Sequence, residues 1–201
     1  VVNGATRRGS KEGIKPVGAE SGTLFIQRAG KSLREFLFSD VELSYISNNI
    51  SLLSSHLLKS PSDMALRKAT STTDGDLLLI VNETDGSLAT YSILRGQNVI
   101  APSLSTTDGE FVNVGVDVDQ IYFTIKRSIS SSDKYYVECF NDDNTTDSAK
   151  LYSGGSKPST TTVTGLSHLE GKTVKVIADD QMQLDKTVSS GQITLDAVPT
   201  T

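Results

Sequence analysis

The chain has 201 residues, a formal net charge of −5 and a single cysteine, Cys139. This length allows one large domain or two small ones, each with a buried core. One cysteine excludes an internal disulfide and a cysteine-based zinc site, and we expect Cys139 to be a small buried strand residue. The acidic balance argues against a dedicated nucleic-acid-binding protein, which would need a basic face. No apolar run is long enough to cross a bilayer, so no membrane contact is expected.

The first 22 residues are rich in glycine and in basic side chains, among them Arg7, Arg8, Lys11 and Lys15. A local basic patch is one interpretation of this segment. We expect instead a poorly ordered or linking N-terminal segment over residues 1–22, because such ends seldom carry packing of their own. The chain begins at Val1 rather than methionine, which favours a fragment or a processed product.

Residues 23–142 are expected to form a β-meander domain, either propeller-like or a sandwich segment. Apolar and polar residues alternate with a period of two, and the stretches between them are rich in turn-forming residues. Thr-Asp-Gly occurs three times, at 73–75, 84–86 and 107–109, and Asp-Gly favours hairpin turns. Gly30-Lys31 predicts one more turn. The predicted strands are Leu24–Arg28, Leu33–Phe38, Leu77–Val81, Leu88–Leu94, Val99–Leu104, Phe111–Val118, Ile121–Lys126 and Tyr135–Phe140.

One short helix is predicted within this all-β domain. In Ser51–Leu58 the apolar residues recur at helical spacing over about two turns. Asn49 or Ser51 could cap its first turn, and Pro61 lies beyond its end. The sequence therefore predicts an all-β fold with a single helix that carries His56.

The composition changes after the meander. Residues 143–157 contain little that could fill a core, and we expect them to form a polar linker. Residues 158–201 are expected to form a small β module, β-barrel-like, whose size is marginal for independent stability. Asp179-Asp180-Gln181 predicts a turn in it. The strands predicted for this module are Thr160–Val163, Thr173–Ala178, Lys186–Val188 and Gln192–Leu195.

The search for catalytic chemistry gives little. The chain has two histidines, His56 and His168, and no nucleophile elbow, phosphate-binding loop or zinc-protease motif accompanies them. Asp142, Asp143 and Asp147 could suggest a calcium loop, but the glycine and terminal glutamate of an EF-hand are missing, so a solvated loop fits better. We therefore predict no catalytic, cofactor-binding or metal-binding residues, and we expect the protein not to be an enzyme.

An ordered set of segments resembles tail proteins of podovirus-like bacteriophages, the tail tubular or nozzle-like family. The segment 163–174, Val-Thr-Gly-Leu-Ser-His-Leu-Glu-Gly-Lys-Thr-Val, is similar to the "Gly-Leu-x-His-Leu-Glu-Gly-x-Thr-Val" pattern of that family. The likeness runs from about Leu24 to Leu195 in the family's order. The chain departs from the family in lacking tryptophan and in having Asp180 where a turn glycine is usual. The other similar segments are Leu24–Phe36, Asn49–Leu58, Gly86–Ile93, Tyr122–Arg127, Tyr135–Glu138 and Val188–Leu195.

The resemblance implies a truncated structural component of a phage tail, part of the nozzle or tube through which DNA leaves the capsid. Its expected location is the virion. Its expected partners are other tail and neck proteins and copies of itself in a ring, and DNA would pass without sequence-specific binding. A negative lumen would repel DNA, which is compatible with the acidic balance. The alternatives are a receptor- or glycan-binding β module and, third, a polysaccharide-degrading enzyme domain.

Overall fold

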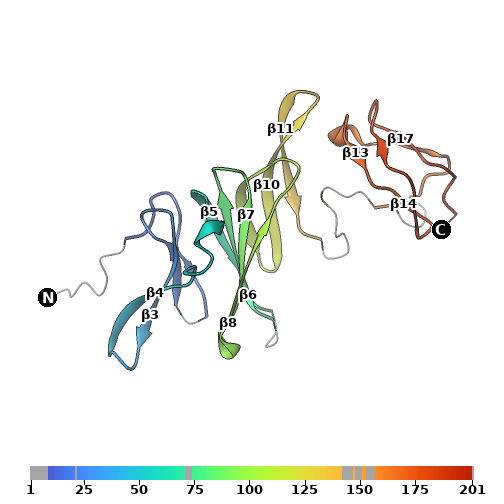
Figure 1. The fold of residues 1–201 in the computed structure, drawn as a ribbon. Helices are drawn as coiled ribbons and strands as arrows, with labels where there is room; N and C mark the ends of the chain where they lie inside the picture. Colours follow the sequence, from blue (N-terminus) through green and yellow to red (C-terminus); the bar gives the residue numbers. More distant parts are fainter. Residues whose placement is uncertain are drawn as a thin grey trace. The chain divides into compact units, whose positions relative to one another are not determined.

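The computed structural model describes residues 9–20, 22–70, 74–141, 147, 151–152 and 157–200. In these residues almost all regular structure is antiparallel strand, which confirms the predicted all-β class (Figure 1). The chain divides into two compact units, Val1–Arg127 with Tyr135–Asp142 and Ser128–Lys134 with Asp143–Thr201. None of the helices in the described ranges is long and apolar enough to span a membrane.

The first unit contains three antiparallel sheets, except that one end of the third sheet, Ser128–Lys134, belongs to the second unit. Each sheet is a meander, in which strands that follow one another in the sequence lie side by side. The first sheet consists of β1 (Val17–Gly18), β2 (Thr23–Ile26), β3 (Leu33–Ser39) and β4 (Ser44–Asn49); the second of β5 (Pro61–Arg67), β6 (Asp76–Asn82), β7 (Leu88–Leu94) and β8 (Val99–Ser105); and the third of β9 (Glu110–Asp117), β10 (Gln120–Ile129) and β11 (Ser132–Cys139).

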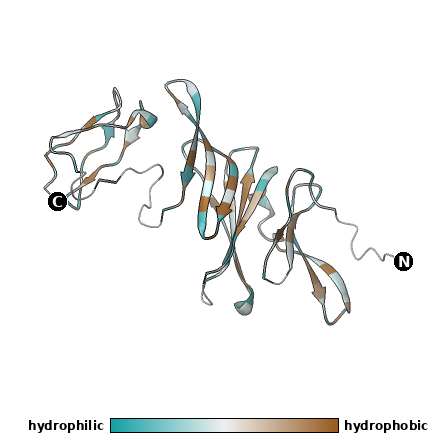
Figure 2. Ribbon diagram, turned by 180° about the vertical axis from the view of Figure 1, so that it is seen from behind, coloured by the Kyte–Doolittle hydropathy of each residue, from teal (hydrophilic) through white to brown (hydrophobic). Residues whose placement is uncertain are grey.

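Strand β6 of the second sheet is buried on both faces. Along β6, Leu78 and Ile80 point to one side, where they pack with Leu24, Leu33 and other residues of the first sheet. Leu79 and Val81 point to the other side, where they pack with the third sheet. Because successive strand residues face opposite ways, the middle of a strand covered twice must be apolar, as Leu77–Val81 of β6 are; the polar residues Asp76 and Asn82 stand at its two ends. Figure 2 shows this concentration of apolar residues in the strands of the second sheet.

Turn residues behave as the sequence predicts. Gly30 lies at φ +70° between β2 and β3, and Gly86 lies at φ +61° between β6 and β7. A Cβ atom on Gly86 would lie 2.5 Å from the Glu110 Cβ, so this position needs glycine both for its backbone angle and for space. Residues 107–109 join β8 to β9. Of the 73–75 turn, Thr73 lies outside the described residues.

The helix predicted over Ser51–Leu58 is wrong. The segment forms turns followed by a single 3-10 turn, Ser55–Leu57, called η1. The reason is that Ser51 and Ser54 turn inward, whereas Leu52 and Leu53 are exposed. The Ser51 Oγ accepts a hydrogen bond from the Leu33 N–H at 2.9 Å, and the Ser54 Oγ lies 3.2 Å from the Tyr91 hydroxyl. Side-chain hydrogen bonds of this kind compete with helix formation.

The sequence did not lead us to predict the strands β1, β4 and β5. Segment 1–22, expected to be poorly ordered or linking, contains β1, and its Ile14 packs in the core beside the first sheet. Residues 1–8 and Ser21 lie outside the described residues. The predicted linker 143–157 also lies mostly outside them; Asp147, Leu151, Tyr152 and Lys157 are its described members.

The second unit contains short strands around a small core. Its described strands form three two-stranded antiparallel pairs, β12 with β17, β13 with β16 and β14 with β15, and residues 157–200 show no closed barrel. The pair β14–β15 turns at Asp179 and Asp180, as predicted, although β15 itself was not. The strands are β12 (Thr162–Val163), β13 (Thr173–Val174), β14 (Ile177–Ala178), β15 (Gln181–Met182), β16 (Lys186–Thr187) and β17 (Ile193–Thr194). The core residues are Val163, Leu166, Val176, Val188, Ile193 and Leu195.

Candidate interaction surface

The two histidines lie in different units and are not brought together by either. His56 is exposed in η1 of the first unit, and His168 is half-buried in the 3-10 turn Ser167–Leu169 of the second. Within the described ranges, no three His, Cys, Asp or Glu side chains are grouped so as to hold a metal ion. Of the acidic run considered for calcium, Asp142 and Asp143 lie outside the described residues, and Asp147 is exposed.

Cys139 is on a strand, as predicted, but it is exposed rather than buried. The alternation of β11 explains the difference. The neighbouring Glu138 reaches the buried Arg127, with contacts of 2.7 Å to both Nε and Nη2, so Glu138 turns toward the sheet interior. Cys139 therefore faces the opposite way.

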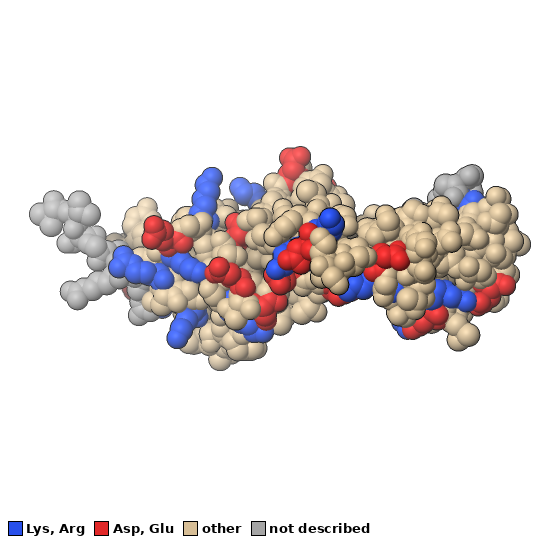
Figure 3. Space-filling view, turned by 90° about the horizontal axis from the view of Figure 1, so that it is seen from above, with Lys and Arg blue, Asp and Glu red and all other residues tan. Residues whose placement is uncertain are grey.

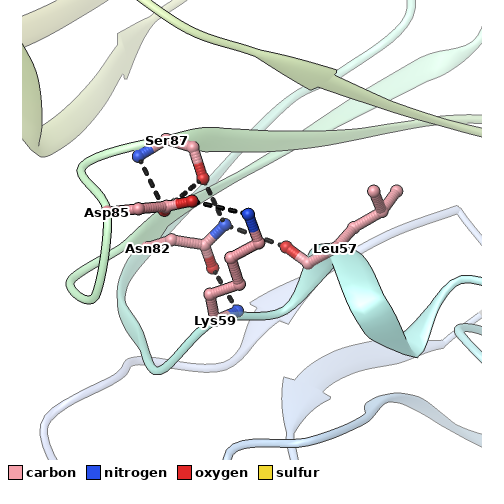
Figure 4. Close-up of polar contacts among 5 residues, drawn as sticks. All are labelled: Leu57, Lys59, Asn82, Asp85 and Ser87. Atoms are coloured by element: carbon pink, nitrogen blue, oxygen red, sulfur yellow. Dashed lines mark hydrogen bonds and ion pairs between the residues drawn. The ribbon is translucent and has the colours of Figure 1, made fainter.

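A polar network fixes the turn between β6 and β7 (Figure 4). The fully buried Asn82 accepts a hydrogen bond from the Lys59 N–H at 2.9 Å and donates to the Leu57 carbonyl at 2.9 Å and to the Ser87 Oγ at 3.0 Å. Ser87 in turn donates from its N–H and its hydroxyl to Asp85, which also contacts the Lys59 Nζ at 2.6 Å. The buried amide is thus satisfied, and the network joins η1 to the second sheet.

Electrostatics support a structural role for this network. Burial raises the pKa of Asp85, but the hydrogen bonds from Lys59 and Ser87 outweigh burial, so the pKa lies below its usual value. Burial raises the pKa of Tyr91, which is partly offset by the hydrogen bond with Ser54. A carboxylate held ionised by its neighbours is poorly suited to act as a general base near neutral pH.

The second unit has a surface depression of about 590 Å³ beside β14 and β15. Its carboxylates already have partners within the unit. Asp179 accepts hydrogen bonds from Thr200, and Asp196 pairs with Lys186. The lining residues of the depression are Ala178, Asp179, Gln181, Met182, Gln183, Leu184, Asp196 and Ala197.

The most unusual surface of the first unit surrounds the β3–β4 hairpin. Figure 2 shows apolar residues on this hairpin where it extends away from the second sheet. We call the group the β4 surface. It comprises Phe38, Val41, Leu43, Tyr45, Leu52 and Leu53, whose relative exposures are 49%, 95%, 79%, 52%, 69% and 93%. Phe38 and Tyr45 lie side by side, Val41 and Leu43 precede β4, and Leu52 and Leu53 follow it. Exposed apolar side chains concentrated along one hairpin mark interaction sites more often than surface leucines scattered singly do.

The aromatic members of the hairpin lie on one face of the first sheet. The register places Phe38 opposite Tyr45 and Phe36 opposite Ser47. The rings of Phe36 and Tyr45 stack with their centroids 5.0 Å apart, and Phe38 meets Tyr45 edge-on at 5.4 Å. Cross-strand aromatic pairs of this kind hold a hairpin rigid while their outer faces stay available.

The turn of the hairpin adds two exposed apolar residues, Val41 and Leu43. Leu43 adopts φ +46°, a left-handed angle that is uncommon for a residue other than glycine, asparagine or aspartate. The turn is supported by the Glu42 N–H, which donates to the Ser39 Oγ at 3.3 Å. The Val41 and Leu43 side chains are both exposed and contribute little to the core.

The outer edge of β4 carries backbone groups that face away from the sheet. The Ile50 N–H donates to the Leu33 carbonyl at 3.0 Å, which makes that pair a hydrogen-bonded one. Hydrogen-bonded and non-hydrogen-bonded pairs alternate along an antiparallel ladder. In this register Ile46 and Asn48 therefore bond to β3, and the N–H and C=O groups of Tyr45, Ser47 and Asn49 point outward. The outward Ser47 carbonyl accepts from Arg34 at 2.9 Å.

The face shown in Figure 3 has no charge distribution that would favour nucleic acid. On the face shown in Figure 3, Lys and Arg side chains alternate with Asp and Glu side chains, and neither sign forms a continuous field. Several opposite charges are paired, for example Lys126 with Glu110 at 2.7 Å and Lys175 with Asp185 at 2.7 Å. A basic stripe, which a phosphate backbone would need, is not seen on that face.

Sequence reasoning missed the β4 surface because it placed no strand at Ser44–Asn49. The available signal was the pair Tyr45-Ile46, two residues common in strands, a few residues after a predicted strand, together with Val41 and Leu43 between them. The sequence matches no known family model, and no curated protein is significantly similar to it.

Proposed function

We propose that this chain is a structural component of a bacteriophage tail, part of the nozzle or tube around the DNA exit channel, and that it works through subunit assembly. The observation that carries the proposal is the β4 surface, an exposed apolar group on a rigid hairpin. A monomer gains nothing from exposing such residues, whereas a subunit buries them against its neighbours.

The architecture supports this proposal. Stacked sheets with cores on both sides of β6 provide a stiff body that transmits load without a moving part. The ordered resemblance to tail tubular proteins supplies the biological setting. The net charge of −5 is compatible with DNA passing the protein without adhering to it.

The test is to purify virions of the phage that encodes this chain and to search for the chain by mass spectrometry. The full-length parent is then combined with its neighbouring tail proteins, and the mass of the complex is measured by light scattering. Presence in the virion together with a ring or a stable partner complex supports the proposal. Absence from virions, or a parent that stays monomeric with every tail partner, contradicts it.

Exposed aromatic rings favour a second candidate function, binding of a receptor glycan. Phe38 and Tyr45 each leave about half of the side chain open to solvent. Aromatic faces of this kind stack on the apolar faces of sugar rings, and loops on β scaffolds often carry recognition. The chain should then bind host surface glycans on an array, and Tyr45→Ala should abolish binding while Tyr135→Ala, at another exposed tyrosine, leaves it intact. Absence of glycan binding leaves assembly as the better account.

A further inference from the structure

We infer that the outer edge of β4 pairs, antiparallel, with β4 of a second copy of this chain. This inference goes beyond the proposed function, and it holds or fails whether or not the chain belongs to a phage tail. It starts from the N–H groups of Tyr45, Ser47 and Asn49 and the C=O groups of Tyr45 and Asn49, which point away from β3; the Ser47 C=O already accepts from Arg34. No other described strand pairs with that edge. An edge of this kind is a template for another strand.

The other sheet edges among the described residues of the first unit are protected. β1 has two residues, and β8 contains Pro102, which lacks an N–H. β11 carries Glu138, and also Asp133 and Lys134 at its end in the second unit. The edges of β5 and β9 lie against each other, where the Val114 N–H donates to the Asp63 carboxylate at 3.0 Å. Short strands, proline and charge are the usual devices that prevent edge pairing.

β4 lacks these devices in its own sequence, and the only outward backbone group that a described residue occupies is the Ser47 carbonyl, which accepts from the Arg34 guanidinium at 2.9 Å. Its sequence, Ser-Tyr-Ile-Ser-Asn-Asn, contains no charged residue and no proline over six positions. Since every other described edge of the unit is protected, the strand in another copy best suited to pair with β4 is β4 itself. Antiparallel pairing of two such strands places no like charges opposite each other.

The apolar residues around β4 fit this arrangement. Val41 and Leu43 precede the strand, and Leu52 and Leu53 follow it. In an antiparallel pair the beginning of one strand lies beside the end of the other. Val41 and Leu43 of one copy would therefore lie near Leu52 and Leu53 of the second copy, at both ends of the contact. A two-fold interface is self-complementary in this way. The four residues are among the most exposed apolar side chains of the unit.

The test uses the whole chain, with light scattering over protein concentrations up to about 1 mM, the upper end of weak affinities. We expect a concentration-dependent dimer. Ser47→Pro removes an outward N–H without touching the bonds to β3, and proline is tolerated at such an edge position. The dimer dissociation constant should rise by about tenfold or more, because a two-fold contact loses the same hydrogen bond twice. Met182→Ser, at an exposed apolar residue of the second unit, is the control and should leave it unchanged.

Amide hydrogen exchange of the unmodified chain decides the matter if Ser47→Pro fails to fold. The Ser47 N–H should exchange rapidly in dilute protein and become protected as the dimer forms, whereas the Asn48 N–H, bonded to β3, should be protected throughout. A chain that is monomeric at every concentration overturns the inference. So does a folded Ser47→Pro variant that associates normally, or a dimer in which exchange at Ser47 does not change.

Discussion

The second sheet of the first unit and the second unit bury their apolar residues in different ways. Each face of β6 meets another sheet, so consecutive residues Leu78 to Val81 are all buried. The second unit has strands of two residues and a single core of six buried side chains. Stability in the first unit therefore comes from long strands covered twice, and in the second from a few contacts that turns and ion pairs hold in place.

The largest expected effect is on the doubly covered sheet. Leu79→Ala removes a fully buried side chain between the second and third sheets. The free energy of unfolding should fall by about 2–5 kcal/mol, because transfer and cavity costs add in a core that cannot collapse. Urea unfolding followed by circular dichroism measures the change. Leu104→Ala, at an exposed position of β8, is the control, and an equal loss there would contradict the two-sided burial of β6.

Asn82→Ala should give the next largest effect, because the network of Figure 4 depends on this amide. The Lys59 N–H and the Leu57 carbonyl would lose their partner. Leaving buried polar groups unsatisfied costs about 1–3 kcal/mol, which should appear as a lower urea midpoint. Asn113→Ala tests an exposed asparagine whose side chain reaches Asp63 at 3.5 Å, and its midpoint should hardly change.

A smaller effect is expected in the second unit. Val188 is almost fully buried in its core. Val188→Ala removes two methyl groups and should reduce the local stability by about 1.5–2 kcal/mol. Faster amide exchange at Val163 and Ile193 would report this change, while the amides of β6 stay protected. Val198→Ala, at a half-exposed valine, serves for comparison. Slower exchange in β6 than in the second unit before any substitution would sharpen the contrast between the two cores.

The smallest effect concerns pH. Because the folded-state pKa of Asp85 lies below its usual value of 3.8, ionised Asp85 stabilises the fold above that value, and this contribution is lost as pH falls through the folded-state pKa. The carboxylate is partly exposed, so solvent screening keeps the effect small. Thermal melts between pH 7 and pH 2 should show a slightly smaller acid-induced decrease for Asp85→Asn than for the unmodified chain. Asp119→Asn, in an exposed turn, should follow the unmodified chain.

Much of the fold was predictable because its strands follow local rules. The strands predicted at Leu88–Leu94 and Leu33–Phe38 lie at β7 and β3, and the Asp-Gly pair at 85–86 turns the chain between β6 and β7. The candidate site was not predictable to the same degree. The β4 surface depends on which side of a hairpin another sheet covers, and alternation alone cannot show this.

The sequence by itself determined the all-β class, the positions of most strands and the turns, because hydrophobic period and turn chemistry are local properties of the chain. Tertiary structure decided the rest. Ser51 and Ser54 found partners in Leu33 and Tyr91 far along the chain, and these bonds replaced the predicted helix. Cys139 became exposed because its neighbour Glu138 reached the buried Arg127. In each case a contact with a residue elsewhere in the chain stabilised the observed conformation by more than the local preference stabilised the predicted one.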